Sequence, residues 1–392
     1  MRSLRALSLV GFLLAPLATS CGGFDPNGVE DRDEPEADAT LSSALLSSDT
    51  ESSEALVVSL VAPVRPVTTS DEHVHLVYEF LIQNDSAVSQ NITRLDVLGS
   101  GRRTPLASLS ADTLAASLIS NAATGSIEPG ETAVVLFDLV FGSDEPLPTR
   151  LRHRIQSQGE RPAVQAGPIV PVLRERAVRL GPPLRGGGLV DVNGCCGRGE
   201  HTSALIPSDA GVFLAQRYAI DFMRVEGISS FRGDASDNAS YFIFGDDVIA
   251  AAGGRIVAVA DGAPENLPGE SPPFDLDTAL GNYVVEALSD GRFALYAHLQ
   301  TGSVRVRSGE RVQRGQVLGQ VGNTGGSTEP HLHFHVMDGP SPVLSNGLPY
   351  VFDEFELQGH IDLTGSEAVA VPTPLPQRRE NRLPMALDVI AF

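Results

Sequence analysis

Residues 330–336 read PHLHFHV and follow a glycine-rich run, VGNTGGS, at 321–327. Side chains alternate between the two faces of an extended strand, so His331, His333 and His335 are expected on the same face. Neutral imidazole is the commonest metal ligand, so such a face suits a transition-metal site. The alternative is a polar strand face whose histidines are merely solvated, and the surrounding sequence has to decide between the two.

The segments before this stretch are typical of short β-strands joined by tight turns. A strand at 282–287 (NYVVEA) is followed by a turn at 289–291 (SDG) and a strand at 293–299 (FALYAHL) that contains His298. Glycines in the segment 309–319 (GERVQRGQVLG) indicate further turns. The histidine stretch therefore closes a β-rich region.

This region resembles the lysostaphin-type (LytM-like) zinc endopeptidases, secreted enzymes that cut peptide cross-links of bacterial cell walls. The likeness rests on YAHL at 296–299, GQVLG at 315–319 and GGSTEPHLH at 325–333. Upstream, VAVADG at 257–262 and GNYVV at 281–285 match core strands of the family. The resemblance implies an all-β, lysostaphin-type antiparallel β-sheet peptidase core, of the duplicated hybrid motif kind, and covers less than half of the chain.

The resemblance also implies roles for individual residues. His333 would be a zinc ligand, while His298 and His331 would flank the metal as catalytic histidines. The other two ligands of the family come from an H-x-x-x-D motif, whose aspartate is present here as Asp221 in QRYAIDF, 216–222. The position four residues before it is Arg217, which cannot serve as a ligand because its guanidinium stays protonated.

Two interpretations follow from Arg217. In the first, His201, twenty residues before Asp221, folds back to supply the missing nitrogen, as a related subgroup suggests, so that His201, Asp221 and His333 hold the metal. In the second, the site binds metal poorly and the domain is a non-hydrolytic member, like some regulators of cell-wall hydrolases. His335 is expected to support the site rather than to bind the metal.

The residue types fit hydrolysis. A zinc ion held by three protein ligands keeps an open position for water, whose pKa falls to about 7. One neutral imidazole can take the proton of that water, and a second can stabilise the oxyanion or protonate the leaving amine. The sequence does not divide these tasks between His298 and His331. The expected function is an exported zinc metalloendopeptidase acting on peptidoglycan peptide stems or cross-bridges, with a non-catalytic, wall-binding or hydrolase-activating lipoprotein as the alternative.

Composition excludes other classes. A formal net charge of −21 argues against a nucleic-acid-binding surface. The segment 309–319 also resembles the hairpins of biotinyl and lipoyl carrier domains, but those domains attach their cofactor to a lysine and this chain has none.

The amino terminus predicts export. Residues 1–20 carry Arg2, Arg5 and an apolar run at 7–17, as in a signal peptide, and the run is too short to span a bilayer well. The following LATSC resembles a bacterial lipobox with Cys21 as the lipidated residue, and an ordinary cleaved signal peptide is the alternative. We expect a lipid-anchored lipoprotein of the periplasm, outer membrane or cell surface, which meets the membrane only through Cys21; its oligomeric state stays open.

The 392 residues are enough for two or three domains. An acidic, serine-rich disordered tether is expected at 21–54, an immunoglobulin-like β-sandwich at 55–171, a linker at 172–200, the peptidase-like domain at 201–361 and an irregular tail at 362–392.

Two further features remain from the sequence. His73 and His75 form a second H-x-H pair. We interpret it as a solvated strand face, because the only other histidine in this part of the sequence, His153, is distant. Cys195 and Cys196 are adjacent and give no disulfide framework, so a vicinal disulfide, free thiols and an intermolecular link all remain open.

Overall fold

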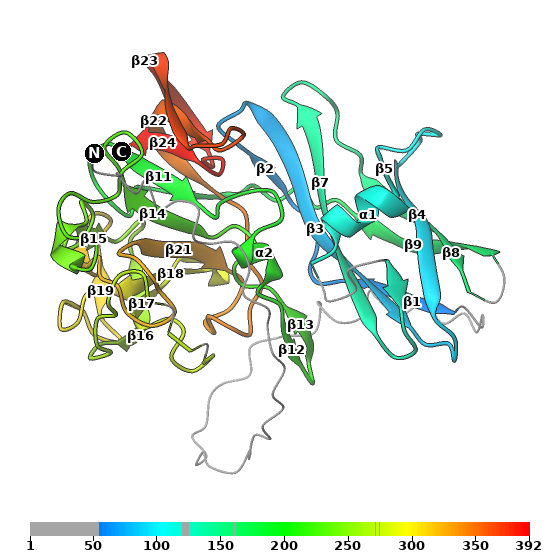
Figure 1. Cartoon of the computed structure of the whole chain (residues 1–392), viewed down its shortest axis with the longest axis horizontal. Coiled ribbons are helices and arrows are strands. Elements are labelled where there is room, and N and C mark those ends of the chain that lie inside the picture. Colours follow the sequence, from blue (N-terminus) through cyan, green and yellow to red (C-terminus); the bar gives the residue numbers. More distant parts are fainter. Residues whose placement is uncertain (1–54, 120–124, 160–161, 271, 274) are drawn as a thin grey trace, which may run out of the picture. The chain divides into compact units, whose positions relative to one another are not determined.

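The computed structural model describes residues 55–119, 125–159, 162–270, 272–273 and 275–392, and these form mostly antiparallel β-structure (Figure 1). The predicted signal peptide, Cys21 and the tether lie outside the described residues. Among the described helices, none has the length and apolar character that a membrane crossing requires.

Two antiparallel sheets make up the first part of the described chain. The first sheet consists of β1 (Leu56–Leu60), β2 (Pro66–Thr68), β3 (His73–Asn84) and β7 (Thr132–Gly142). The second consists of β4 (Gln90–Gly99), β5 (Ala107–Ser110), β6 (Ser126–Ile127), β8 (Arg150–Gln158) and β9 (Pro162–Pro171), with α1 (Ala111–Ser117) following β5. Phe80 and Phe137 of the first sheet share one apolar core with Leu95 and Ile155 of the second. The arrangement is that of a β-sandwich, and its immunoglobulin-like type stays a prediction.

A larger sheet carries the predicted site. In the described residues its strands follow the order β10-β22-β24-β11-β14-β21-β18-β17-β16-β19, with β23 on the outer side of β22. Neighbours are antiparallel except β10 and β22, which are parallel. The bounds are β10 (Val178–Leu180), β11 (Leu189–Val192), β14 (Ile220–Arg224), β16 (Gly254–Ala260), β17 (Asn282–Ala287), β18 (Phe293–Leu299), β19 (Arg311–Val312), β21 (Leu332–Met337), β22 (Tyr350–Asp362), β23 (Val369–Arg382) and β24 (Asp388–Ala391).

Short elements fill the connections of this sheet. Two small two-stranded sheets pair β12 (Ile206–Ser208) with β13 (Gly211–Phe213) and β15 (Asp247–Ile249) with β20 (Val317–Gln320). The helical turns are α2 (Glu200–Ser203), η1 (Asn238–Ser240) and η2 (Ser289–Gly291).

Strand β21 is central because it is flanked by β14 and β18 and all of its residues are buried. Leu332, Phe334 and Val336 alternate onto the face that joins the main apolar core. The ring of Phe334 packs against Tyr296 and Tyr350, with centroids 5.2 and 5.4 Å apart. The intervening histidines are thereby left on the opposite face, as the alternation predicts.

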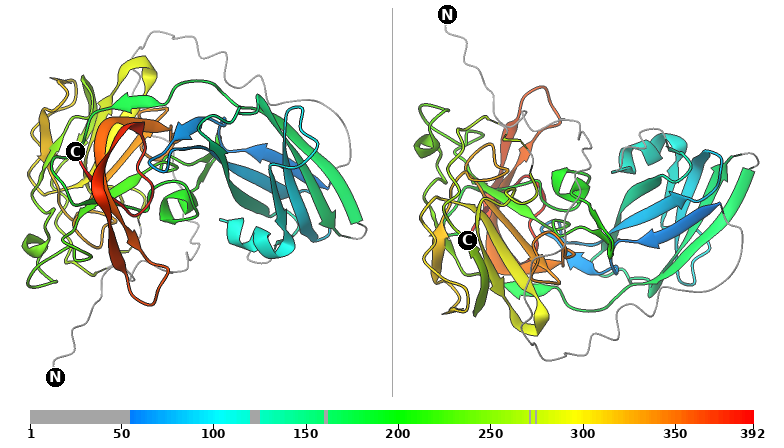
Figure 2. Two further views of the ribbon diagram at one scale, coloured as in Figure 1. Left: turned by 90° about the horizontal axis from the view of Figure 1, so that it is seen from above. Right: turned by 90° about the horizontal axis from the view of Figure 1, so that it is seen from below.

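The expected irregular tail is wrong. Residues 369–382 form β23, which runs beside β22 as a long hairpin (Figure 2), and residues 388–391 form β24 inside the sheet. Pro374 and Pro376 are tolerated because they fall where the β22–β23 register is interrupted, between Leu357 and Gly359. The expected linker is also partly strand, since β10 and β11 lie within it and β11 pairs with β14.

The interpretation of the H-x-H pair at 73–75 is wrong for one of its two histidines. His73 is exposed, but His75 is 2% exposed and hydrogen-bonds to Asp138.

Cys195 and Cys196 are joined to each other by a disulfide.

Candidate functional site

Strand register brings two of the predicted metal ligands together. Asp221 on β14 lies directly opposite His333 on β21, and His333 lies opposite Ala297 on β18. Directly opposed residues in a sheet have their side chains on the same face. Nδ1 of His333 is accordingly 2.8 Å from Oδ1 of Asp221.

His201 reaches the same carboxylate from the helical turn α2. Its Nε2 is 3.2 Å from Oδ2 of Asp221. Its Nδ1 lies 2.8 Å from the carbonyl oxygen of Asn193 and 3.2 Å from that of Ala219. Carbonyl oxygens only accept, so Nδ1 carries the hydrogen and the lone pair of neutral His201 is on Nε2. A lone pair and a carboxylate oxygen repel each other at this distance, so the arrangement is favourable only with a proton or a metal cation between them.

Asn193 holds both of these groups and was missed by the sequence analysis. Its side-chain Nδ2 donates to Oδ2 of Asp221 at 3.0 Å, while its carbonyl accepts from His201. It adopts a left-handed backbone with φ of 57°. The only signal in the sequence is Asn193-Gly194 after a strand-like segment, which predicts a turn and nothing more.

Arg217 lies away from these ligands. Its Nε donates to both carboxylate oxygens of Glu79 at 2.8 and 2.9 Å, and its Nη1 donates to the carbonyl of Gly347 at 2.9 Å. Glu79 belongs to β3 and is fully buried. The residue that replaces the expected histidine therefore forms a buried ion pair with the sandwich instead of entering the site.

His298 is directed into the site by a bulge in β18. The β17–β18 register shifts between Asn282 and Val284, where β18 has one extra residue, and His298 has a left-handed φ of 61°. Bulges re-aim side chains and recur beside active sites. Nδ1 of His298 donates to the carbonyl of Thr324 at 2.8 Å, which leaves Nε2 as the bare nitrogen.

His331 stands beside His298, with ring centroids 4.7 Å apart. Its Nδ1 donates to the carbonyl of Glu329 at 2.8 Å, and its Nε2 is 3.5 Å from Oδ1 of Asp221. The two predicted catalytic histidines therefore present the same nitrogen, Nε2, as a base, because backbone carbonyls hold the hydrogen on the other one.

The charges around the carboxylate determine the protonation states. Burial alone would raise the pKa of Asp221, but His201 and His331 lower it well below its usual range. Burial, reinforced by His331 and His333, lowers the pKa of His298 well below its usual value. Burial lowers the pKa of His201, but the charge of Asp221 outweighs burial, so the pKa of His201 is raised. The site thus combines an ionised Asp221 with a neutral His298.

His335 packs behind His333. Its Nδ1 is 2.9 Å from Nε2 of His333, and its own Nε2 has no partner among the described residues. Burial, together with the charge of His333, lowers the pKa of His335 well below its usual value, so the ring is neutral. A neutral His335 can accept the Nε2 hydrogen of His333 and leave the lone pair of His333 on Nδ1, toward Asp221.

Comparison with known proteins identifies the class. Residues 241–344 match the model of the family described as Peptidase family M23, a match that contains His298, His331 and His333. By this match, residues 241–344 belong to a Peptidase M23 (LytM-like) domain.

Individual relatives match over limited segments. The chain is 31% identical over 148 residues to the cell division protein DipM of Caulobacter vibrioides, covering 37% of this chain and 22% of DipM. It is 37% identical over 93 residues to the peptidoglycan DD-endopeptidase ShyC of Vibrio cholerae, covering 24% and 19%. The aligned part thus spans about a fifth of each of these relatives.

A solved structure of the lysostaphin catalytic domain from Staphylococcus simulans is 22% identical, with a TM-score of 0.22, and covers 42% of this chain and 88% of that one. A zinc-containing peptidase from Vibrio cholerae is 15% identical, with a TM-score of 0.24, and covers 68% and 79%.

Proposed function

We propose that this protein is a zinc metalloendopeptidase that hydrolyses peptide cross-links of bacterial peptidoglycan. The observation that carries the proposal is the convergence of His201, His333 and Asp221, whose candidate ligand atoms all lie within 4.8 Å of one another. The match of residues 241–344 to Peptidase family M23 supports it, as does the similarity to ShyC, a peptidoglycan DD-endopeptidase.

The donor set fits zinc. Two imidazole nitrogens and one carboxylate are ligands that zinc takes in catalytic sites, where the fourth position stays open for water. The hydrogen bonds of His201 to backbone carbonyls direct its lone pair at Asp221, as a ligand requires. Asn193 holds the carboxylate in place from the other side.

The residues of the chain would share the proton transfers. Bound zinc would supply a Lewis acid and lower the pKa of a coordinated water. His298 and His331 each offer a bare Nε2, so either could accept the proton of the attacking water; the ring that carries this proton could then stabilise the oxyanion or deliver the proton to the leaving amine. Because the Nδ1–H groups of both rings are bonded to backbone carbonyls, Nε2 is the atom at which each ring would take up and release the proton.

The same proposal includes the location of the protein. The signal-like segment at 1–20 and the lipobox-like sequence before Cys21 support export and lipid anchoring. An exported protein would meet peptide stems or cross-bridges of the wall directly.

A second candidate function is a non-catalytic LytM-like lipoprotein that binds the wall or activates other hydrolases. Arg217 at the usual position of a histidine ligand favours it. Zinc content separates the two candidates, because only the peptidase needs a stoichiometric metal.

The test measures zinc per chain and release of soluble wall peptides, with and without a chelator. We expect one zinc in the wild type and chelator-sensitive digestion, with both lost in His201→Ala and His333→Ala. His360→Ala removes an exposed histidine of β22 and should leave both intact. A wild type that is purified with zinc in the buffer and still holds no stoichiometric zinc would overturn the peptidase proposal.

A further inference from the structure

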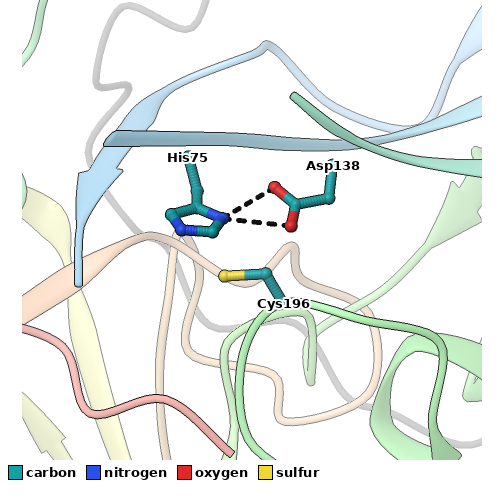
Figure 3. A group of neighbouring side chains, drawn as sticks. All are labelled: His75, Asp138 and Cys196. Atoms are coloured by element: carbon teal, nitrogen blue, oxygen red, sulfur yellow. Dashed lines mark hydrogen bonds and ion pairs between the residues drawn. The ribbon is translucent and has the colours of Figure 1, made fainter. Parts of the chain in front are cut away.

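A second group of metal-ligating side chains lies outside the site described above. His75 comes from β3, Asp138 from β7 and Cys196 from the loop between β11 and α2 (Figure 3). Their candidate ligand atoms all lie within 4.8 Å of one another. None of the three belongs to the peptidase motifs, and the group does not depend on the proposed function.

Strand register explains how the first two residues meet. His75 pairs with Val140 and Val77 pairs with Asp138, so His75 and Asp138 are diagonal neighbours on one face of the β3–β7 ladder. Nδ1 of His75 donates to both carboxylate oxygens of Asp138 at 2.9 and 3.0 Å. Its Nε2 lies 3.4 Å from Oδ2 of Asp71.

Two carboxylates therefore surround one imidazole. Burial lowers the pKa of His75, but Asp138 and Asp71 outweigh it, and the net direction is upward. A protonated His75 would balance the charge of the two carboxylates. A divalent cation bound to the same side chains would take over that balance.

Cys196 adds the third donor. It is 3% exposed, and its sulfur points toward the His75 ring (Figure 3). In this structure the sulfur is bonded to that of Cys195. A thiolate is a strong ligand for zinc, whereas a disulfide sulfur carries no charge and is no substitute for it.

We propose that reduction of the Cys195–Cys196 disulfide creates a zinc site formed by His75, Asp138 and Cys196. A dithiol reductant breaks the S–S bond, becomes a disulfide itself and leaves two cysteine thiols. Zinc then displaces the proton of the Cys196 thiol and the extra proton of His75, both to solvent. The ion is held by one nitrogen, one carboxylate and one thiolate, and water completes the tetrahedral site.

The position of Cys196 links this site to the peptidase ligands. In the sequence, Cys196 lies between Asn193 of the same loop, which bonds Asp221, and His201 of the helical turn α2 that follows. Metal at the reduced site would tie that loop to the sandwich strands β3 and β7.

Cobalt distinguishes the two sites, since only the proposed one contains sulfur. The full chain is reduced with a dithiol, freed of reductant without air and titrated with Co2+ beside an untreated sample. A thiolate-to-cobalt charge-transfer band in the near ultraviolet should appear in the reduced sample alone, with one more bound Co2+ per chain. Added zinc should remove the band.

Variants make the assignment specific. Cys196→Ser, His75→Ala and the nearly isosteric Asp138→Asn should lose or strongly weaken the band, while Cys195→Ser, which leaves Cys196 as a free thiol, should show it without reductant. Circular dichroism confirms that each variant is folded. No band in reduced wild type and Cys195→Ser, or an unchanged band in folded Asp138→Asn and His75→Ala, overturns the proposal. If the peptidase site still holds zinc when the band is absent, the failure concerns the proposed site at His75, Asp138 and Cys196 alone.

Discussion

His201 and His298 reach the same carboxylate environment by different backbone routes. His201 stands on a helical turn and is aimed by two backbone carbonyls, whereas His298 is turned inward by a bulge and a left-handed φ of 61°. At the scale of residues, precision comes from backbone partners that hold the hydrogen of each ring on Nδ1. Such outer partners usually matter almost as much as the ligands themselves.

Asn193 provides a test of this idea. We expect Asn193→Ala to lower zinc affinity by about 10- to 100-fold, because Asp221 loses the amide donor that orients it. Competition with a chromogenic chelator measures the affinity. Asn381→Ala is the matched control, since Asn381 also has a left-handed backbone but is exposed. Equal losses of affinity in both variants would mean that backbone strain, not the hydrogen bond, is responsible.

Much of the residue-level site could be predicted from motifs. The alternation expected at 330–336 placed His331, His333 and His335 on one face, the resemblance implied His298 and Asp221, and one of the two interpretations of Arg217 named His201. The structure brings these side chains together, while their catalytic and ligand roles remain proposals. Asn193 was missed because an Asn-Gly turn occurs at many loops, and no spacing connects it to Asp221.

At the scale of elements, strand β17 carries a buried carboxyl group. Glu286 is fully buried and accepts a hydrogen bond from the hydroxyl of Tyr296 at 2.7 Å. Burial raises the pKa of Glu286 to about 7. The strand therefore contains a group that is neutral when folded at mildly acidic pH and ionised when unfolded.

The sign of the pH effect follows from this. The folded state binds a proton that the unfolded state releases above its ordinary pKa of 4.5, so stability falls as pH rises from about 4.5 to about 7. Glu286→Gln should remove this loss and stabilise the protein by about 3 kcal/mol at pH 8, with little effect at pH 4.5. Urea unfolding at both pH values measures it. Glu356→Gln, an exposed change on β22, should have the same small effect at both.

Strands β23 and β24 show where sequence patterns failed at this scale. Three prolines at alternate positions, 372, 374 and 376, are typical of irregular chain. The structure accommodates Pro374 and Pro376 at a break in the register of an edge strand, which no local pattern reveals. Residues 369–382 become a strand because they pair with β22, which is a tertiary interaction.

At the scale of the whole molecule, the buried Glu79–Arg217 pair joins the sandwich to the large sheet. The two residues are separated by 138 positions in the chain, so no motif could have paired them. Their contact explains why the departure at Arg217 does not leave Asp221 without a histidine neighbour: the arginine is paired with Glu79, and His201 lies at Asp221 instead.

Breaking this pair should be costly. We expect Glu79→Gln to destabilise the protein by about 3–5 kcal/mol, because the guanidinium stays buried without its counter-charge. Replacing both residues with methionine should recover much of the loss. Equilibrium unfolding of the single and double variants measures the coupling. Glu354→Gln, which removes the exposed partner of Arg378, should cost less than about 1 kcal/mol, and a similar cost for Glu79→Gln would contradict the prediction.

The prolines of β23 have a consequence for how copies of this protein meet. In the part of the chain that the structure describes, β23 pairs with β22 and with no second strand, and it exposes Leu375 and Val369, which are 76% and 54% accessible. A bare strand edge with apolar side chains is a template for pairing with another molecule. Pro372, Pro374 and Pro376 have no N–H to donate, so the hairpin resists edge-to-edge aggregation even where many copies are crowded together.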